Sequence, residues 1–163
     1  MTRKITFVHA PLIQYDQNYG VTLNPLWAYT LAAHVPEGWD VEIIDREITD
    51  PATTGAADVF AFSGMNKDIE SIRVVHDDLK AKHPDATFIL GGPMTWSMDQ
   101  EDKLDVLLYF DHVFILDGEE TLPDFLERFA QGTHGELPQI IRADRFPVSR
   151  ARKVRFDLIR HTA

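Results

Sequence analysis

Short runs of aliphatic, aromatic and β-branched residues recur along the chain, and turn-forming residues flank each of them. Such runs predict buried strands. Five of them lie at residues 5–8, 41–45, 58–63, 86–90 and 112–116. A sixth, shorter strand is predicted at residues 139–141.

Segments with apolar residues at every third or fourth position lie between these runs. They predict helices at residues 24–35, 66–79, 100–108 and 118–129. Asn24 and Asn66 are the expected capping residues of the first two helices, and Pro25 suits the first helical position. Strands that alternate with helices predict an α/β fold with a doubly wound, mostly parallel sheet of five to six strands, flavodoxin-like or Rossmann-like.

The domain predicted from this pattern covers residues 1–142, and residues 143–163 have a different character. This last segment contains five arginines and one lysine and shows no clear periodicity. We interpret it as a basic linker or tail.

Charge and composition restrict the function. The 163 residues include 26 acidic and 16 basic side chains, a formal net charge of −10, which argues against binding to nucleic acid or to an anionic membrane. The chain has no cysteine, so it cannot form a disulfide, a thiolate zinc site or a cysteine-ligated iron–sulfur cluster by itself. A cytoplasmic location is expected, because cysteine-free composition is compatible with it and no stretch reaches the roughly 20 apolar residues of a membrane span.

Several common sites of α/β proteins are missing from the sequence. His9-Ala10-Pro11-Leu12 stands where a dinucleotide site needs Gly-x-Gly-x-x-Gly, and no phosphate-binding Gly-x-x-x-x-Gly-Lys-Ser/Thr is present. His9 and Ser63 end the first and third strands, where a phosphoacceptor domain needs acids. None of the seven histidines has a partner at His-x-x-x-His spacing, and each is expected to be exposed or capped. No catalytic residue is therefore predicted within this chain.

The candidate site lies at the carboxyl ends of the strands, where parallel α/β sheets bind ligands. Small and polar residues follow four strands: Tyr19, Gly20 and Thr22; Ser63, Gly64, Met65 and Asn66; Gly91, Gly92 and Pro93; and Gly118, Glu119, Glu120 and Thr121. Each group is also compatible with a plain turn or helix start. Together they predict an edge with room for a large, partly flat ligand.

This pattern resembles the N-terminal cobalamin-binding domain of B12-dependent radical SAM enzymes. The matching features, in order, are Asn24-Pro25-Leu26, Gly38 with Val41 and Asp45, the strand 58–63, Pro84, Gly91-Gly92-Pro93, and Asp117-Gly118-Glu119-Glu120-Thr121. The similarity covers about residues 4–131, and Phe156-Asp157-Leu158 is similar to the family's linker.

The resemblance implies a cobalamin-binding domain whose cobalt has no protein histidine ligand, since Asp-x-His-x-x-Gly is absent. It implies that Ser63 and Met65 meet the nucleotide tail of the cofactor, that Gly91 and Gly92 make space for it, and that residues 118–121 flank the corrin. S-adenosylmethionine and a [4Fe-4S] cluster would belong to a radical SAM domain in cis that is missing here, because the family's Cys-x-x-x-Cys-x-x-Cys is absent. The parent protein would then carry out methyl transfer or cyclisation.

Two alternatives stay open. The chain is either an excised front domain or a free-standing relative without radical chemistry. Its function is either cofactor binding or, as a cofactor-free module of the same fold, protein interaction through Trp27, Met65 and Trp96.

Overall fold

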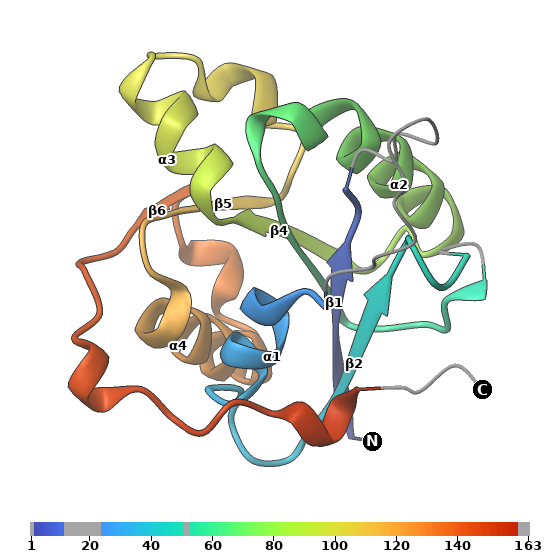
Figure 1. Ribbon diagram of the computed structural model, residues 1–163, viewed down its shortest axis with the longest axis vertical. Helices are drawn as coiled ribbons and strands as arrows, with labels where there is room; N and C mark the ends of the chain where they lie inside the picture. The colour runs from blue at the N-terminus through green and yellow to red at the C-terminus, as the bar shows by residue number, and fades with distance from the viewer. Residues whose placement is uncertain (1, 12–23, 51–52, 160–163) are drawn as a thin grey trace.

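Six parallel strands form a single sheet in the order β2-β1-β3-β4-β5-β6 (Figure 1). The structure is a computed structural model and describes residues 2–11, 24–50 and 53–159. The strands are β1 Arg3–His9, β2 Trp39–Asp45, β3 Val59–Ser63, β4 Thr87–Gly91, β5 His112–Ile115 and β6 Ile140–Arg142. The chain passes from β1 outward to β2 and then returns to β3 on the other side of β1, so the strand order reverses there. The predicted doubly wound α/β fold is confirmed.

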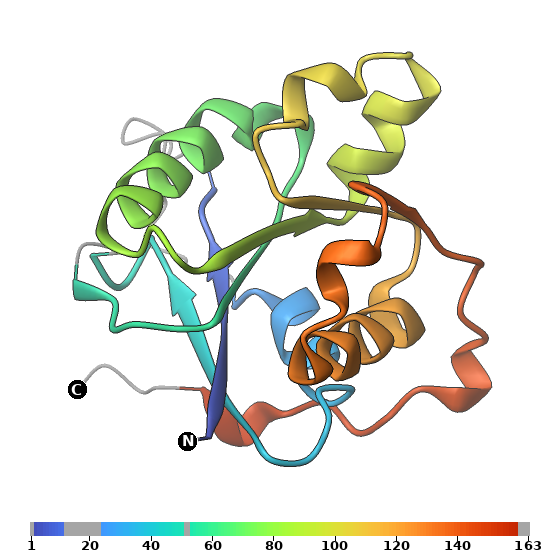
Figure 2. The ribbon, with the colours of Figure 1, turned by 180° about the vertical axis from the view of Figure 1, so that it is seen from behind.

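Helices cover both faces of the sheet (Figures 1 and 2). α1 (Leu26–Ala32) and α4 (Gly118–Gln131) pack on one face, and α2 (Ile69–Lys82) and α3 (Pro93–Gln100) pack on the other. Alternate residues of each strand point to opposite faces. Thus Ala61 of β3 belongs to the α1/α4 side of the core, while its neighbours Phe60 and Phe62 belong to the α2/α3 side.

The face on which α4 lies is unusual. α1 connects β1 to β2, which lies on one side of β1. α2, α3 and α4 connect β3 to β4, β4 to β5 and β5 to β6, and these connections run across the sheet in the opposite direction. α2 and α3 lie on the face opposite α1, so these three crossovers have the same hand. α4 lies on the same face as α1, so the β5–α4–β6 crossover has the opposite hand, although about 98% of such connections share one hand.

The third helix was predicted at the wrong place. α3 spans Pro93–Gln100, and only a 3₁₀ turn, Leu104–Leu107, falls inside the predicted range 100–108. Pro93 occupies the first helical position, where its fixed φ and missing N–H are favourable. The Gly-Gly-Pro sequence was predicted to be a cofactor-binding strand end, with a tight turn as the plain alternative, and the start of α3 at Pro93 was not predicted.

The predicted caps are wrong as well. Pro25, not Asn24, occupies the N-cap position of α1, and no side chain accepts a hydrogen bond from the first backbone N–H groups of that helix. Asn66 lies in a 3₁₀ turn, Asn66–Asp68, and donates its side-chain amide to Ser97 Oγ at 2.9 Å. The carboxylate of Asp68 accepts the Met65 backbone N–H at 2.8 Å instead. A carboxylate accepts this N–H more strongly than a neutral amide oxygen does.

The segment after β6 runs along the outer surface of α4 and α1 (Figure 2). The Phe146 N–H donates to Asp117 Oδ2 at 2.7 Å, and Arg150 forms an ion pair with Glu120 at 2.5 Å. Farther along, the Arg155 N–H donates to the Tyr29 carbonyl at 3.1 Å. The basic tail predicted from residue 143 is therefore docked on the two helices as far as the structure describes it, to residue 159.

Three histidines that were expected to be exposed or capped are buried: His34, His76 and His112. His76 lies among aromatic rings, with the Phe110 and Tyr109 ring centroids at 4.7 Å and 4.8 Å from its own. Burial lowers the pKa of His76, and its hydrogen bond to Asp77 opposes this shift. Burial lowers the pKa values of His34 and His134 in the same way.

These lowered pKa values predict that the domain loses stability in mild acid. A histidine whose folded pKa is depressed binds fewer protons in the folded state than in the unfolded state. Its contribution is complete above the unfolded pKa of about 6.5 and declines as the pH falls below that value. Urea unfolding between pH 7.5 and 5 should show this decline, and His76→Gln should flatten it. An unchanged slope in the variant would show that His76 is not one of the groups responsible.

Candidate cofactor slot

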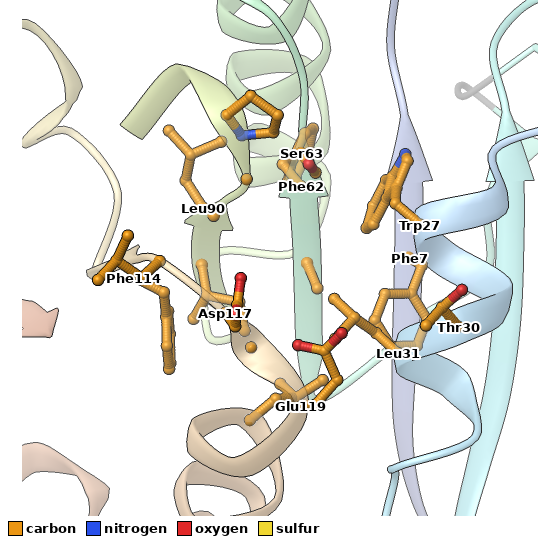
Figure 3. A pocket seen from close by; sticks show the side chains of 18 of the residues that line it. Phe7, Trp27, Thr30, Leu31, Phe62, Ser63, Leu90, Phe114, Asp117 and Glu119 are labelled. Carbon is orange, nitrogen blue, oxygen red and sulfur yellow. The ribbon is translucent and has the colours of Figure 1, made fainter. Parts of the chain in front are cut away.

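A cavity of about 390 Å³ opens between α1 and α4 at the carboxyl ends of the central strands. We call this cavity the slot. Figure 3 shows side chains from α1 on one side, from the segment after β5 and the start of α4 on the other, and from the strands behind. The volume is within the range typical of small-molecule sites, roughly 300–1,000 Å³. The slot lies beside the reversal of strand order between β1 and β3, where α/β sheets commonly bind ligands.

The parallel register divides the sheet side of the slot into two rows. The outer row joins His9, Ser63 and Gly91, the last residues of β1, β3 and β4. The row below it joins Phe7, Ala61 and Ile89. Ser63, Gly91 and Ala61 have little or no side chain, and together they leave the space that forms the slot.

The remaining lining is mostly apolar. Leu26, Trp27 and Leu31 of α1 lie on one side, and Phe114, Leu116 and Leu122 lie on the other. The polar side chains that line the slot are Thr30, Ser63, Asp117 and Glu119, along with the indole N–H of Trp27. The Thr30 hydroxyl donates to the Leu26 carbonyl at 2.9 Å, and the Trp27 indole N–H donates to His9 Nδ1 at 3.4 Å. Both donors are thus engaged within the protein.

Two residues at the rim have backbone conformations that residues other than glycine rarely adopt. Leu116, directly after β5, has φ +75°. Gly92 has φ +91° and ψ −168°, a region used almost only by glycine. A Cβ added to Gly92 would overlap Ser63 Oγ. Backbone strain of this kind is common next to ligand sites and lasts only where the surrounding structure enforces it.

The slot brings together six of the predicted site residues: Ser63, Gly91, Gly92, Pro93, Gly118 and Glu119. Gly118 allows α4 to approach α1 closely, since a Cβ there would lie 3.2 Å from Leu31 Cδ2.

Five other predicted residues lie near the rim but outside the lining: Gly64, Met65, Asn66, Glu120 and Thr121. A Cβ on Gly64 would lie 2.7 Å from Ile72 Cδ1, so this glycine lets α2 pack against the turn. The Met65 side chain is exposed. The Thr121 hydroxyl donates to the Asp117 carbonyl at 3.3 Å. Tyr19, Gly20 and Thr22 lie outside the described residues.

Sequence reasoning missed most of the apolar lining. Trp27 and Leu31 are four positions apart on α1 and therefore share a helix face, a spacing that was visible in the sequence. Ala61 was visible as the one small residue between Phe60 and Phe62. Of the three residues of the protein-interaction alternative, Trp27 lines the slot, and Met65 and Trp96 are exposed.

A second hollow, of about 360 Å³, adjoins the slot. It shares Gly92, Pro93, Leu116 and Asp117 with the slot, and it adds Trp96 and Arg145. Arg145 belongs to the segment that follows β6, so a basic residue contributes to the lining of this second hollow. The described part of the chain contains no cluster of three or more histidine and carboxylate side chains that could hold a metal ion, and none of its helices is long and apolar enough to cross a membrane.

Comparison with known proteins shows the family of this chain. The chain is 30% identical over 142 residues to a protein named "Uncharacterized methyltransferase sll1242" from Synechocystis sp. (strain ATCC 27184 / PCC 6803 / Kazusa). The aligned region covers 85% of this chain and 25% of that protein, so the chain spans about a quarter of its relative's length. The family model for the B12 binding domain matches residues 16–126, more than half of the chain. The chain belongs to the B12-binding domain family.

Proposed function

We propose that this domain binds cobalamin, with the nucleotide tail of the cofactor in the slot and the corrin over the rim. The observation that carries the proposal is the opening between α1 and α4, which exists because Ala61, Ser63 and Gly91 leave the sheet uncovered there. The residues fit the group. The apolar floor suits the flat lower base, and Ser63 and Arg145 are hydrogen-bond donors near the opening for the phosphate of the tail.

The chain's own residues would hold and orient the cofactor. Trp27 and Leu31 would contact one side of the base, and Phe114 and Leu122 the other. Glu120 and Thr121, outside the lining but close to the rim, would face the corrin. Met65, which the resemblance places at the nucleotide tail, is exposed outside the lining and would face the corrin as well. When bound, the cobalamin would supply a cobalt centre able to carry an alkyl group.

We further propose that no histidine of the domain ligates cobalt. The motif that provides this ligand in other B12-binding domains is absent. Among the described residues, His9 is the histidine at the strand ends, and its Nδ1 accepts a hydrogen bond from Trp27. None of the histidines in the described part of the chain lines the slot.

The parent protein, in this proposal, is a B12-dependent radical SAM enzyme that transfers a methyl group or cyclises its substrate. The name of the relative from Synechocystis, a methyltransferase, supports methyl transfer. S-adenosylmethionine and the [4Fe-4S] cluster would be bound by another domain, because this chain has no cysteine. The reading frame that encodes the chain is expected to encode Cys-x-x-x-Cys-x-x-Cys as well. A complete frame without that triplet would contradict the radical SAM assignment.

Titration of the full chain with hydroxocobalamin tests the binding. Cobalamin is expected to co-elute with the protein and to raise its melting temperature, since a ligand at 100 times its Kd stabilises the folded state by about 2.7 kcal/mol. His9→Ala is expected to leave the visible spectrum of the bound cofactor unchanged. A changed spectrum would overturn the proposal of no histidine ligand. Absence of both co-elution and a thermal shift at millimolar cobalamin would overturn the binding itself.

A further inference from the structure

The inner part of the slot is poor in hydrogen-bond donors. Its floor is the row Phe7, Ala61 and Ile89, and the backbone groups of this row are in the middle of the parallel ladder. Phe114 of β5 lies level with Gly91, in the outer row, and Leu31 and Leu122 face the floor from the helices. None of these six side chains can donate or accept a hydrogen bond.

The polar groups of the lining do not supply the missing donors. The Thr30 hydroxyl and the Trp27 indole N–H are already bonded within the protein. Ser63 belongs to the outer row, two residues nearer the strand ends than Ala61. Glu119 comes from the first turn of α4, and as a carboxylate it accepts hydrogen bonds and donates none.

We infer that the slot selects cobamides whose lower base is a benzimidazole over those whose lower base is a purine. This inference rests on the proposed function. The six-membered ring of adenine has two ring nitrogens where dimethylbenzimidazole has ring carbons, and it carries an amine where dimethylbenzimidazole has only a hydrogen. Glu119 could accept from the amine, but the two ring nitrogens would lose water without gaining a donor. Burying an acceptor without a hydrogen-bond partner weakens binding, whereas burying a methyl group in the same place strengthens it.

The expected discrimination is moderate. Apolar pockets reject a polar analogue of similar shape by about ten- to a hundredfold. The full chain is therefore expected to bind cobalamin about ten- to a hundredfold more tightly than the cobamide with adenine as its lower base. Cobinamide, which has no nucleotide tail, is expected to bind more weakly than cobalamin, because it leaves the slot unfilled.

Competition among these three corrinoids for the full chain, followed by equilibrium ultrafiltration, tests the inference. Equal affinity for cobalamin and the adenine cobamide, with weaker cobinamide binding, would overturn the selectivity while leaving the tail in the slot. Equal affinity for cobalamin and cobinamide would show that the tail does not use the slot, which also overturns the selectivity. No binding of any corrinoid would overturn the proposed function and this inference with it.

A substitution at the floor provides an independent test. Ala61→Ser places a hydroxyl donor in the inner row and is expected to reduce the preference for cobalamin over the adenine cobamide several-fold. Ala56→Ser is the matched control, because Ala56 is exposed in the loop before β3. It is expected to keep the wild-type ratio. If Ala61→Ser binds both corrinoids in the wild-type ratio, polarity at the floor does not determine the selectivity.

Discussion

Gly91→Leu is expected to weaken cobalamin binding by about a hundredfold or more, equivalent to about 2.7 kcal/mol. Gly91 ends β4, lines the slot and lies beside Ser63 in the outer row. A Cβ at this position would meet Phe114 Cβ at 3.6 Å, an ordinary contact, and its φ is not in the left-handed region. The strand therefore tolerates a side chain, but the branched end of a leucine fills space that we assign to the nucleotide tail. Calorimetry with hydroxocobalamin measures the change in affinity.

Two controls separate loss of space from loss of fold. Gly91→Ala fits the same position without reaching across the slot, and we expect only a small change in Kd. Gly135→Leu introduces the same side chain away from the slot, at a glycine where an added Cβ would have no atom within 4 Å. All three variants are expected to melt within a few degrees of the wild-type chain. Wild-type affinity in a folded Gly91→Leu variant would show that the tail lies elsewhere.

Gly92→Ala is expected to destabilise the domain by about 3 kcal/mol or more, even though it adds one methyl group. The backbone of Gly92 is in a region that costs other residues about 1–3 kcal/mol. The added Cβ would also overlap Ser63 Oγ and approach Ser63 Cβ to 3.2 Å, and overpacking of this kind typically costs about 1–3 kcal/mol. The shift in the midpoint of urea unfolding at pH 7.5 measures the sum of the backbone cost and the overpacking cost.

A double variant divides that sum into its two causes. Ser63→Gly removes the hydroxyl and Cβ that the new methyl would meet, but it leaves the backbone conformation unchanged. Adding it to Gly92→Ala is expected to recover the packing part, roughly half of the loss, and no more. Full recovery would indicate that the backbone at residue 92 is not strained, and an unfolding midpoint unchanged in Gly92→Ala alone would contradict the whole explanation.

The sequence predicted the rim of the slot better than its interior. Ser63 and Gly91 were found because parallel strands end at one edge of the sheet, so residues that follow them in the sequence meet in space. Ala61 and Phe114 were missed because they lie within strands, where an inward-facing residue cannot be told from a lining residue by pattern alone. α3 was misplaced because a Gly-Gly-Pro sequence suits both a turn and a helix start.

Periodicity along the chain was sufficient to determine the strands, the parallel sheet and the sheet edge at which the slot lies. It did not determine on which face α4 packs. Four crossovers of the same hand would have placed α4 with α2 and α3, and no slot beside α1 would exist. α1 has only seven residues and is about 10 Å long, too short to cover the apolar face from β1 to β5. Leu122, Phe125 and Leu126 of α4 pack on that face and bury its apolar side chains. This burial joins residues that are far apart in the sequence, so only the tertiary structure decides it.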